Sequence, residues 1–148
     1  MFRMSRKLLF AIEAVLDIAY NAGSQPVQSK DITERQGIPR RYLEQVLQQL
    51  VRAGILAGVR GPRGGYLLAR ERRRITVGEI TRVVAAVEAD EATEPESALG
   101  RRVVWPMWQE FEKEMMERLE STTIEELCLR AHAAGISSEA AERLDFII

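Results

Sequence analysis

Residues 38–69 combine an amphipathic helical repeat with two short alternating runs, and this combination constrains the fold more than any other part of the chain. The turn residues Arg60-Gly61-Pro62-Arg63-Gly64-Gly65 separate the two runs and supply the backbone freedom that a tight hairpin needs. The pattern therefore predicts a helix that leads directly into a basic β-hairpin. Its apolar stripe is expected to be buried and consists of Leu43, Val46, Leu47, Leu50 and Val51.

The opposite side of this helix carries hydrogen-bonding side chains. Arg40, Arg41, Glu44 and Gln45 share that side at helical spacing. The major groove of DNA admits such a helix, and there arginine pairs with guanine, glutamine with adenine and glutamate with the cytosine amine. The exposed face thus offers the side-chain types that read bases.

Charge is divided unequally along the chain. Residues 1–87 contain fifteen Lys and Arg against seven Asp and Glu, a net charge of +8, whereas residues 88–148 contain six against fifteen, a net charge of −9. Phosphates attract the first part through counterion release and repel the second. The division favours double-stranded DNA as the partner of the first part. A solvated basic surface, or a protein-interaction module that docks an acidic partner, is the alternative.

Helical periodicity and turn signals outline three regions. Residues 1–87 predict helices over about 5–21 and 29–36, a third helix between Pro39 and Gly54, the hairpin, and a fourth helix capped by Thr76. Residues 88–100 are rich in acids and contain only one large apolar side chain, so we expect an acidic flexible linker. The fold class is mainly α with a small β-hairpin wing, and residues 101–148 add helices.

The last region begins with a long helix over about residues 103–119. An apolar stripe on a helix of this length needs a partner, and a second copy of the chain would supply one through two-fold symmetry. We expect a homodimer; packing of this helix against its own domain is the alternative. The expected dimerisation residues are Val104, Trp108, Phe111, Met115 and Leu119.

The motifs of the first region, in order, are ERQGI, YLEQVLQQLVRAGI, VRGPRGGYLLAR and ITVGEI. In this order the chain resembles the Rrf2 family of bacterial winged helix-turn-helix regulators, the group that contains IscR, NsrR and CymR. The resemblance covers essentially the whole chain and is most specific over residues 32–87. It implies a homodimeric transcription factor, most simply a repressor, that binds an inverted-repeat operator.

The resemblance also implies roles for individual residues. The start of the third helix, including Tyr42, would enter the major groove, and the wing residues Arg60, Arg63 and Gly64 would reach the minor groove. Near the first helix this chain has Leu8, Leu9 and Phe10 where the family often has a glycine, a basic residue and a tyrosine. The phosphate contact there is expected to pass to residues at the start of that helix, Ser5, Arg6 and Lys7.

Members of the family that sense iron, nitric oxide or redox state usually carry three cysteines after the fourth helix. This chain has none in residues 88–100, and cluster iron prefers thiolates, so we predict a member without an iron-sulfur cluster or other cofactor. The signal is then expected to come from a metabolic enzyme or a small-molecule effector.

Cys128 is the single cysteine and lies four residues before His132, the single histidine. The pair would share one side of a helix and could serve a thiol-responsive or metal-responsive sensor, but two ligands do not complete a zinc site and a lone cysteine is more often a buried apolar residue. No metal site and no catalytic residues are predicted, and the chain is not expected to be an enzyme. No run of eighteen apolar residues occurs, so we expect no membrane association and a cytoplasmic location.

Overall fold

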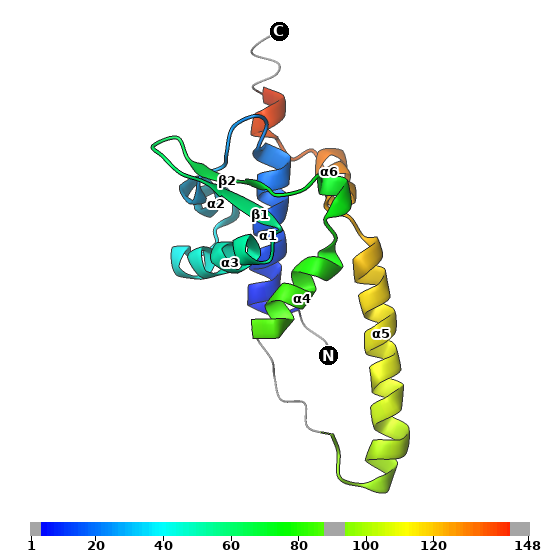
Figure 1. Cartoon of the computed structure of the whole chain (residues 1–148). Helices are drawn as coiled ribbons and strands as arrows, with labels where there is room; N and C mark the ends of the chain where they lie inside the picture. Colours follow the sequence, from blue (N-terminus) through cyan, green and yellow to red (C-terminus); the bar gives the residue numbers. More distant parts are fainter. Residues whose placement is uncertain (1–3, 88–93, 143–148) are drawn as a thin grey trace.

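The structure is a computed structural model that describes residues 4–87 and 94–142. Most of the predicted acidic linker, residues 88–93, and the last six residues lie outside the described parts. The prediction of a mainly α fold with a small hairpin is confirmed (Figure 1). In chain order the elements are α1 (Arg6–Asn21), α2 (Ser29–Gln36), α3 (Arg40–Arg52), β1 (Leu56–Val59), β2 (Gly65–Leu68), η1 (Arg72–Arg74), α4 (Val77–Val87), η2 (Gly100–Val104), α5 (Trp105–Ser121) and α6 (Ile124–Ala133).

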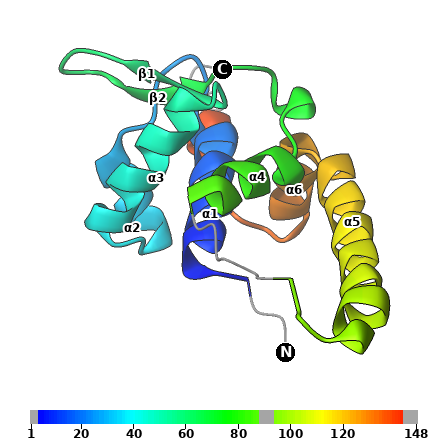
Figure 2. The same ribbon diagram turned by 60° about the horizontal axis from the view of Figure 1, so that its bottom comes forward.

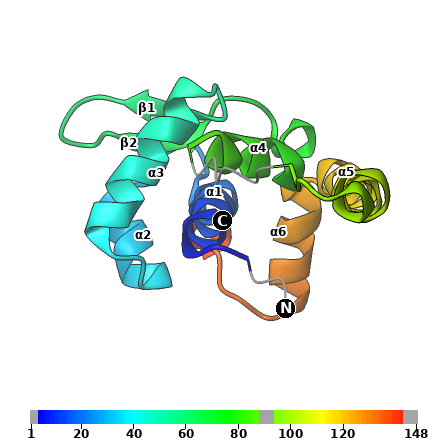
Figure 3. The same ribbon diagram turned by 90° about the horizontal axis from the view of Figure 1, so that it is seen from below.

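The core surrounds α1. Viewed along this helix, α2 and α3 lie on one side, α6 lies on the other, and α4 crosses between them (Figure 3). Each surrounding helix turns its apolar stripe toward α1, which excludes water from one continuous core. The largest fully buried side chains are Val15, Ile18, Ile32, Ile38, Leu43, Leu47, Leu50, Ile55, Leu56, Ile75, Ile80 and Ile124.

Local capping groups place the helix ends close to their predicted positions. The Ser5 hydroxyl accepts the Leu8 N–H at 3.2 Å at the start of α1, and Gly37 closes α2 in the left-handed conformation with φ 66°. Thr76 and Thr123 accept the N–H groups three residues later at 3.1 Å each. These contacts satisfy backbone groups that a helix end would otherwise leave unpaired.

The wing is the hairpin β1–β2 together with its tip, residues 60–64. The strands are antiparallel, and Leu56 pairs with Leu68 and Val59 with Gly65. Val27, from the connection between α1 and α2, forms a single β-bridge to the wing, because it exchanges backbone hydrogen bonds with Tyr66 at 2.9 and 2.8 Å. A Cβ on Gly65 would lie 2.4 Å from the Val27 carbonyl oxygen, so this close approach requires glycine.

Helix α4 lies between α1 and α5 (Figure 2). Its start is joined to the α5–α6 junction by two backbone hydrogen bonds, from Val77 to Thr122 and from Ile124 to Ile75, each 2.9 Å long. Gly78 permits the contact with α5, because a Cβ there would lie 2.7 Å from the backbone nitrogen of Glu120. The arm α5 is therefore attached at its C-terminal end, and it extends away from the core toward its N-terminus (Figure 1).

The long helix begins earlier than the sequence pattern predicts. Helical backbone is present from Ala98, and residues 100–104 form a wide π turn before α5 starts at Trp105. Pro106 explains the wide turn, since it has no N–H to bond the carbonyl group four residues earlier. The last residues of the predicted linker are thus part of the arm.

Candidate nucleic-acid interface

Helix α3 presents two distinct sides. Its apolar stripe is buried as predicted, except that Val51 is only half-buried. The polar residues Arg40, Arg41, Glu44 and Gln45 are all exposed on the outer side. The buried stripe therefore fixes the rotation of α3 about its axis and directs this polar group toward solvent.

Arg40 and Glu44 form an ion pair across one helical turn. The distance from Arg40 Nε to Glu44 Oε1 is 3.0 Å, and the two side chains are 82% and 54% exposed. A pair this exposed adds little to stability and separates readily. Both side chains thus remain available to a ligand.

Tyr42, Ser5 and Lys7 lie where the starts of α1 and α3 approach each other. The Tyr42 ring is 44% exposed and packs against Phe10 of α1, with 6.0 Å between ring centroids. The Ser5 oxygen already accepts a hydrogen bond as the cap of α1, and Lys7 is half-buried. In the sequence analysis Tyr42 was assigned to DNA, and its packing role was missed. The aromatic Phe10 near the start of α1 was the residue that could have indicated a packing partner for it.

The wing tip extends beyond the body of the molecule (Figure 1). Arg60 and Arg63, which lie in this tip, are both exposed. Gly61 supports the tip with φ 111°, a conformation that favours glycine. Gly64 is half-buried, and its N–H donates to the Gly61 carbonyl at 2.9 Å. This bond occupies the N–H of Gly64, so the predicted contact of Gly64 with DNA cannot use that donor.

The arginines differ in how they are paired. Arg35, Arg70, Arg73 and Arg82 are each held by a carboxylate, and hydrogen bonding to Glu79 raises the pKa of Arg70. Within residues 4–87 and 94–142, by contrast, no ion pair engages Arg41, Arg60 or Arg63. Arg41, Arg60 and Arg63 are therefore unneutralised cations on α3 and the wing, the two elements that the sequence pattern assigned to DNA.

A shallow hollow beside α3 contains residues that sequence analysis did not single out. It has a volume of about 320 Å³ and is lined by Ser29, Lys30, Thr33, Glu34 and Arg40. Its lining includes the first two residues of α2, and Lys30 adds a cation to that of Arg40. The sequence feature that could have indicated this hollow is the predicted start of α2, in which Lys30 is the second residue.

The predicted dimerisation stripe on α5 is divided by the structure. Val104, Phe111 and Met115 are 52%, 52% and 59% exposed, whereas Trp108 and Leu119 are half-buried. The Trp108 ring packs edge-on against Phe111, and its N–H donates to Glu112 at 3.0 Å. Met107, 43% exposed, joins the exposed set and was missed. No residue of α5 is buried, so its apolar side chains remain largely open to solvent.

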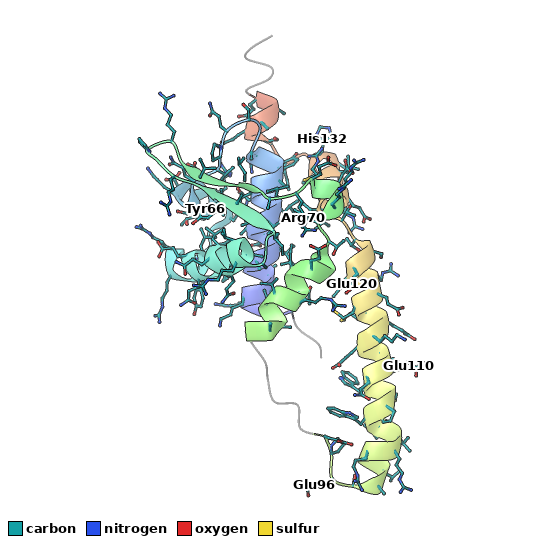
Figure 4. All side chains as sticks on the ribbon, in the orientation of Figure 1. Tyr66, Arg70, Glu96, Glu110, Glu120 and His132 are labelled. Atoms are coloured by element: carbon teal, nitrogen blue, oxygen red, sulfur yellow. The ribbon has the colours of Figure 1, made fainter. Side chains whose placement is uncertain are left out.

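Cys128 and His132 lie in different surroundings on α6. The Cys128 side chain belongs to the core and is 3% exposed, while His132 lies at the surface (Figure 4). Burial raises the pKa of Cys128, and the nearby Arg72 guanidinium opposes this rise only in part. In the part of the chain that the structure describes, no group of three or more His, Cys, Asp and Glu is arranged to hold a metal ion.

None of the helices in the described ranges is both long enough and apolar enough to cross a bilayer. Residues 4–130 match the Rrf2 family, described as iron-dependent transcriptional regulators. The chain is 37% identical over 140 residues to the HTH-type transcriptional regulator IscR of Cronobacter sakazakii, covering 91% of this chain and 85% of the relative. It is 38% identical over 128 residues to IscR of Xenorhabdus nematophila, covering 84% and 78% of the two chains.

Solved structures agree with these relatives. IscR of T. potens superposes with a TM-score of 0.76 at 34% identity, covering 92% of this chain and 93% of the other. CymR, the global cysteine regulator of B. subtilis, superposes with a TM-score of 0.70 at 29% identity, covering 88% and 98%. The relatives are transcriptional regulators and not enzymes, in agreement with the prediction. The chain therefore belongs to the Rrf2 family, and it is a DNA-binding transcriptional regulator of the winged-helix type.

Proposed function

We propose that this regulator binds an inverted-repeat operator as a homodimer and represses transcription. The observation that carries the proposal is the exposed polar side of α3 beside the arginine-bearing wing. In each half-site, α3 enters the major groove, where Arg40, Glu44 and Gln45 read base edges, and Arg41 contacts phosphate. Arg60 and Arg63 of the wing enter the neighbouring minor groove.

The two copies are proposed to meet through α5. Its exposed apolar side chains support this, because a second copy would cover the same side chains on both arms. Two-fold symmetry also matches a palindromic site with half-sites about one helical turn apart. The unequal division of charge is consistent with DNA binding by the first part and dimerisation by the second. The acidic residues 88–148 contain α5, and the basic residues 1–87 contain α3.

The regulator is further proposed to work without an iron-sulfur cluster. The chain has one cysteine, Cys128, and its thiol is buried in the core with a raised pKa, whereas an iron-sulfur cluster needs several ligands that are mainly cysteine thiolates. The donor set of this chain does not fit the iron chemistry in the family description. Its signal is instead proposed to be an enzyme partner or a small metabolite in the cytoplasm, where the DNA lies.

Footprinting on the DNA upstream of its own gene tests the function. We expect one protected region containing an inverted repeat, bound at least about a thousandfold more tightly than random duplex. Arg40→Ala and Glu44→Ala should each change the preferred bases, because they remove contacts to base edges. Equal binding to all duplexes would instead support a nonspecific basic surface, and no binding to any duplex would support the protein-interaction alternative.

A further inference from the structure

The segment after α6 returns to the helix-turn-helix, and we call residues 136–142 the C-terminal clasp. The Ser138 hydroxyl donates to the Tyr20 carbonyl at 2.6 Å, and the Glu139 N–H donates to Asn21 Oδ1 at 3.1 Å. The Tyr20 hydroxyl in turn donates to the Ile136 carbonyl. The clasp is thereby attached to the last turn of α1, although 118 residues separate Tyr20 from Ser138 in the chain.

Arg35 of α2 connects the clasp to a buried carboxylate. Its Nε and Nη2 donate to the two oxygens of Asp17 at 2.9 and 2.8 Å, and its Nη1 donates to Glu139 at 2.7 Å. Gln36 adds a third donor to Asp17 at 2.8 Å. The Asp17 side chain has no exposed surface and that of Arg35 is 21% exposed, so solvent and salt screen this pair less than a surface pair. The Glu139 side chain is 44% exposed. One guanidinium thus ties α2 to α1 and to the clasp together.

The position of α2 determines that of α3. The two helices pack against each other and are joined by a tight turn in which Gly37 is left-handed and Ile38 is fully buried. A short turn with a buried anchor transmits a rotation of one helix to the next. A change in the Arg35 contacts would therefore move the exposed side of α3.

We propose that the C-terminal clasp, acting through Glu139 and Arg35, is a positioning device that holds α2, and with it α3, in the orientation that reads DNA. Glu139 and Arg35 are positioning residues, because Arg35 acts through α2 and Glu139 acts through Arg35. The effect on DNA binding rests on the proposed function, whereas the hold on α2 and α3 is a property of the free protein.

Hydrogen exchange on the full chain without DNA tests that hold. Glu139→Gln removes one of the two carboxylates that pair with Arg35 and leaves the Asp17 pair in place. The amides of α2 and α3 should then exchange about two- to fivefold faster, while those of α4 stay unchanged. The double variant Tyr20→Phe with Glu139→Gln should exchange faster still. Glu142→Gln, an exposed residue of the same segment, is the matched control and should resemble the parent. Equal exchange in the Glu139 and Glu142 variants would overturn the proposal.

Binding of a labelled duplex from the gene's own upstream region tests the consequence. Glu139→Gln should raise the Kd about two- to fivefold and leave the salt slope of log K unchanged, because no phosphate contact is lost. Glu142→Gln should change neither quantity. Faster exchange with an unchanged Kd would overturn the positioning role. If the parent itself ignores the duplex, the proposed function fails, and hydrogen exchange still decides whether the clasp holds α2.

Discussion

At the scale of single residues, Gly64 contributes through its missing side chain. A Cβ at this position would lie 2.1 Å from the Val59 carbonyl oxygen and 2.9 Å from that of Gly61, and both neighbours are backbone atoms that cannot rotate away. Any side chain would therefore open the wing tip and displace the two arginines beside it. Glycine at this position is required by the shape of the wing.

Gly64→Ala should thus weaken DNA binding without unfolding the protein. We expect an affinity loss of about tenfold, equivalent to about 1.4 kcal/mol, because Arg60 and Arg63 move while the core stays intact. Fluorescence anisotropy with the upstream duplex and a thermal melt measure the two effects. Gly58→Ala is the matched control, since nothing lies within 4 Å of a Cβ there. Parental affinity in the Gly64 variant would refute this account of the tip.

Cys128 is a second residue whose surroundings determine its chemistry. Burial raises the pKa of its thiol, so at a given pH less thiolate is present than in a free cysteine, and the reactive fraction grows only as the pH rises toward that higher value. Iodoacetamide at pH 7.5 should label the folded chain at least about tenfold more slowly than the urea-unfolded chain. Mass spectrometry reads the result without ambiguity, because the chain has one cysteine. Fast labelling of the folded form would favour the thiol-sensor alternative.

At the scale of elements, the arm α5 has the least covered apolar surface. Phe111→Glu places a charge among Val104, Met107 and Met115, and its burial at an interface would be costly. We expect the dissociation constant of the proposed dimer to rise at least about 100-fold, or about 2.7 kcal/mol. Analytical ultracentrifugation measures it. Gln109→Glu adds the same charge at an exposed polar position of the same helix and should leave the dimer intact; loss of the dimer in both variants would point to a general charge effect.

The elements themselves were predictable because their ends depend on local groups. The bounds of α2 match the prediction, and Gly54 and Thr76 act at the helix ends that the sequence pattern assigned to them. Contacts between segments that are distant in the chain have no comparable sequence signal. The pairing of Val27 with the wing and the return of residues 136–142 depend on how helices pack, which periodicity does not report.

The exposure of the candidate site residues was predictable to a similar extent. Helical spacing alone identified the exposed residues of α3, since a strongly amphipathic helix has one orientation on a core. The same reasoning assigned Trp108 and Leu119 to the open side of α5, where the structure finds them half-buried. On a weakly amphipathic helix such as α5, the sequence pattern does not distinguish apolar side chains that face their own domain from those that face solvent.

At the scale of the whole molecule, the separation of charge predicts how salt affects binding. Lys and Arg of the first part displace counterions from DNA, so log K should fall linearly with log salt concentration. Arg63→Ala should weaken binding to all sequences alike and reduce the magnitude of this slope by about one. Arg130→Ala on α6, which already pairs with Glu126, should leave the slope unchanged. A titration series from low to high salt measures both, and identical slopes for the Arg63 variant and the parent would place the wing away from the DNA.

The backbone bridge between the start of α4 and the α5–α6 junction has a consequence for operator architecture. Peptide hydrogen bonds on both sides of Thr76 and Thr123 join the C-terminal end of the arm to the start of α4. In a dimer joined through the two α5 helices, the α3 helix of one copy would then keep a fixed distance and angle from the α3 helix of the other. Such a pair would tolerate substitutions within the spacer of a palindrome far better than the insertion of a single base pair, which moves one half-site around the duplex.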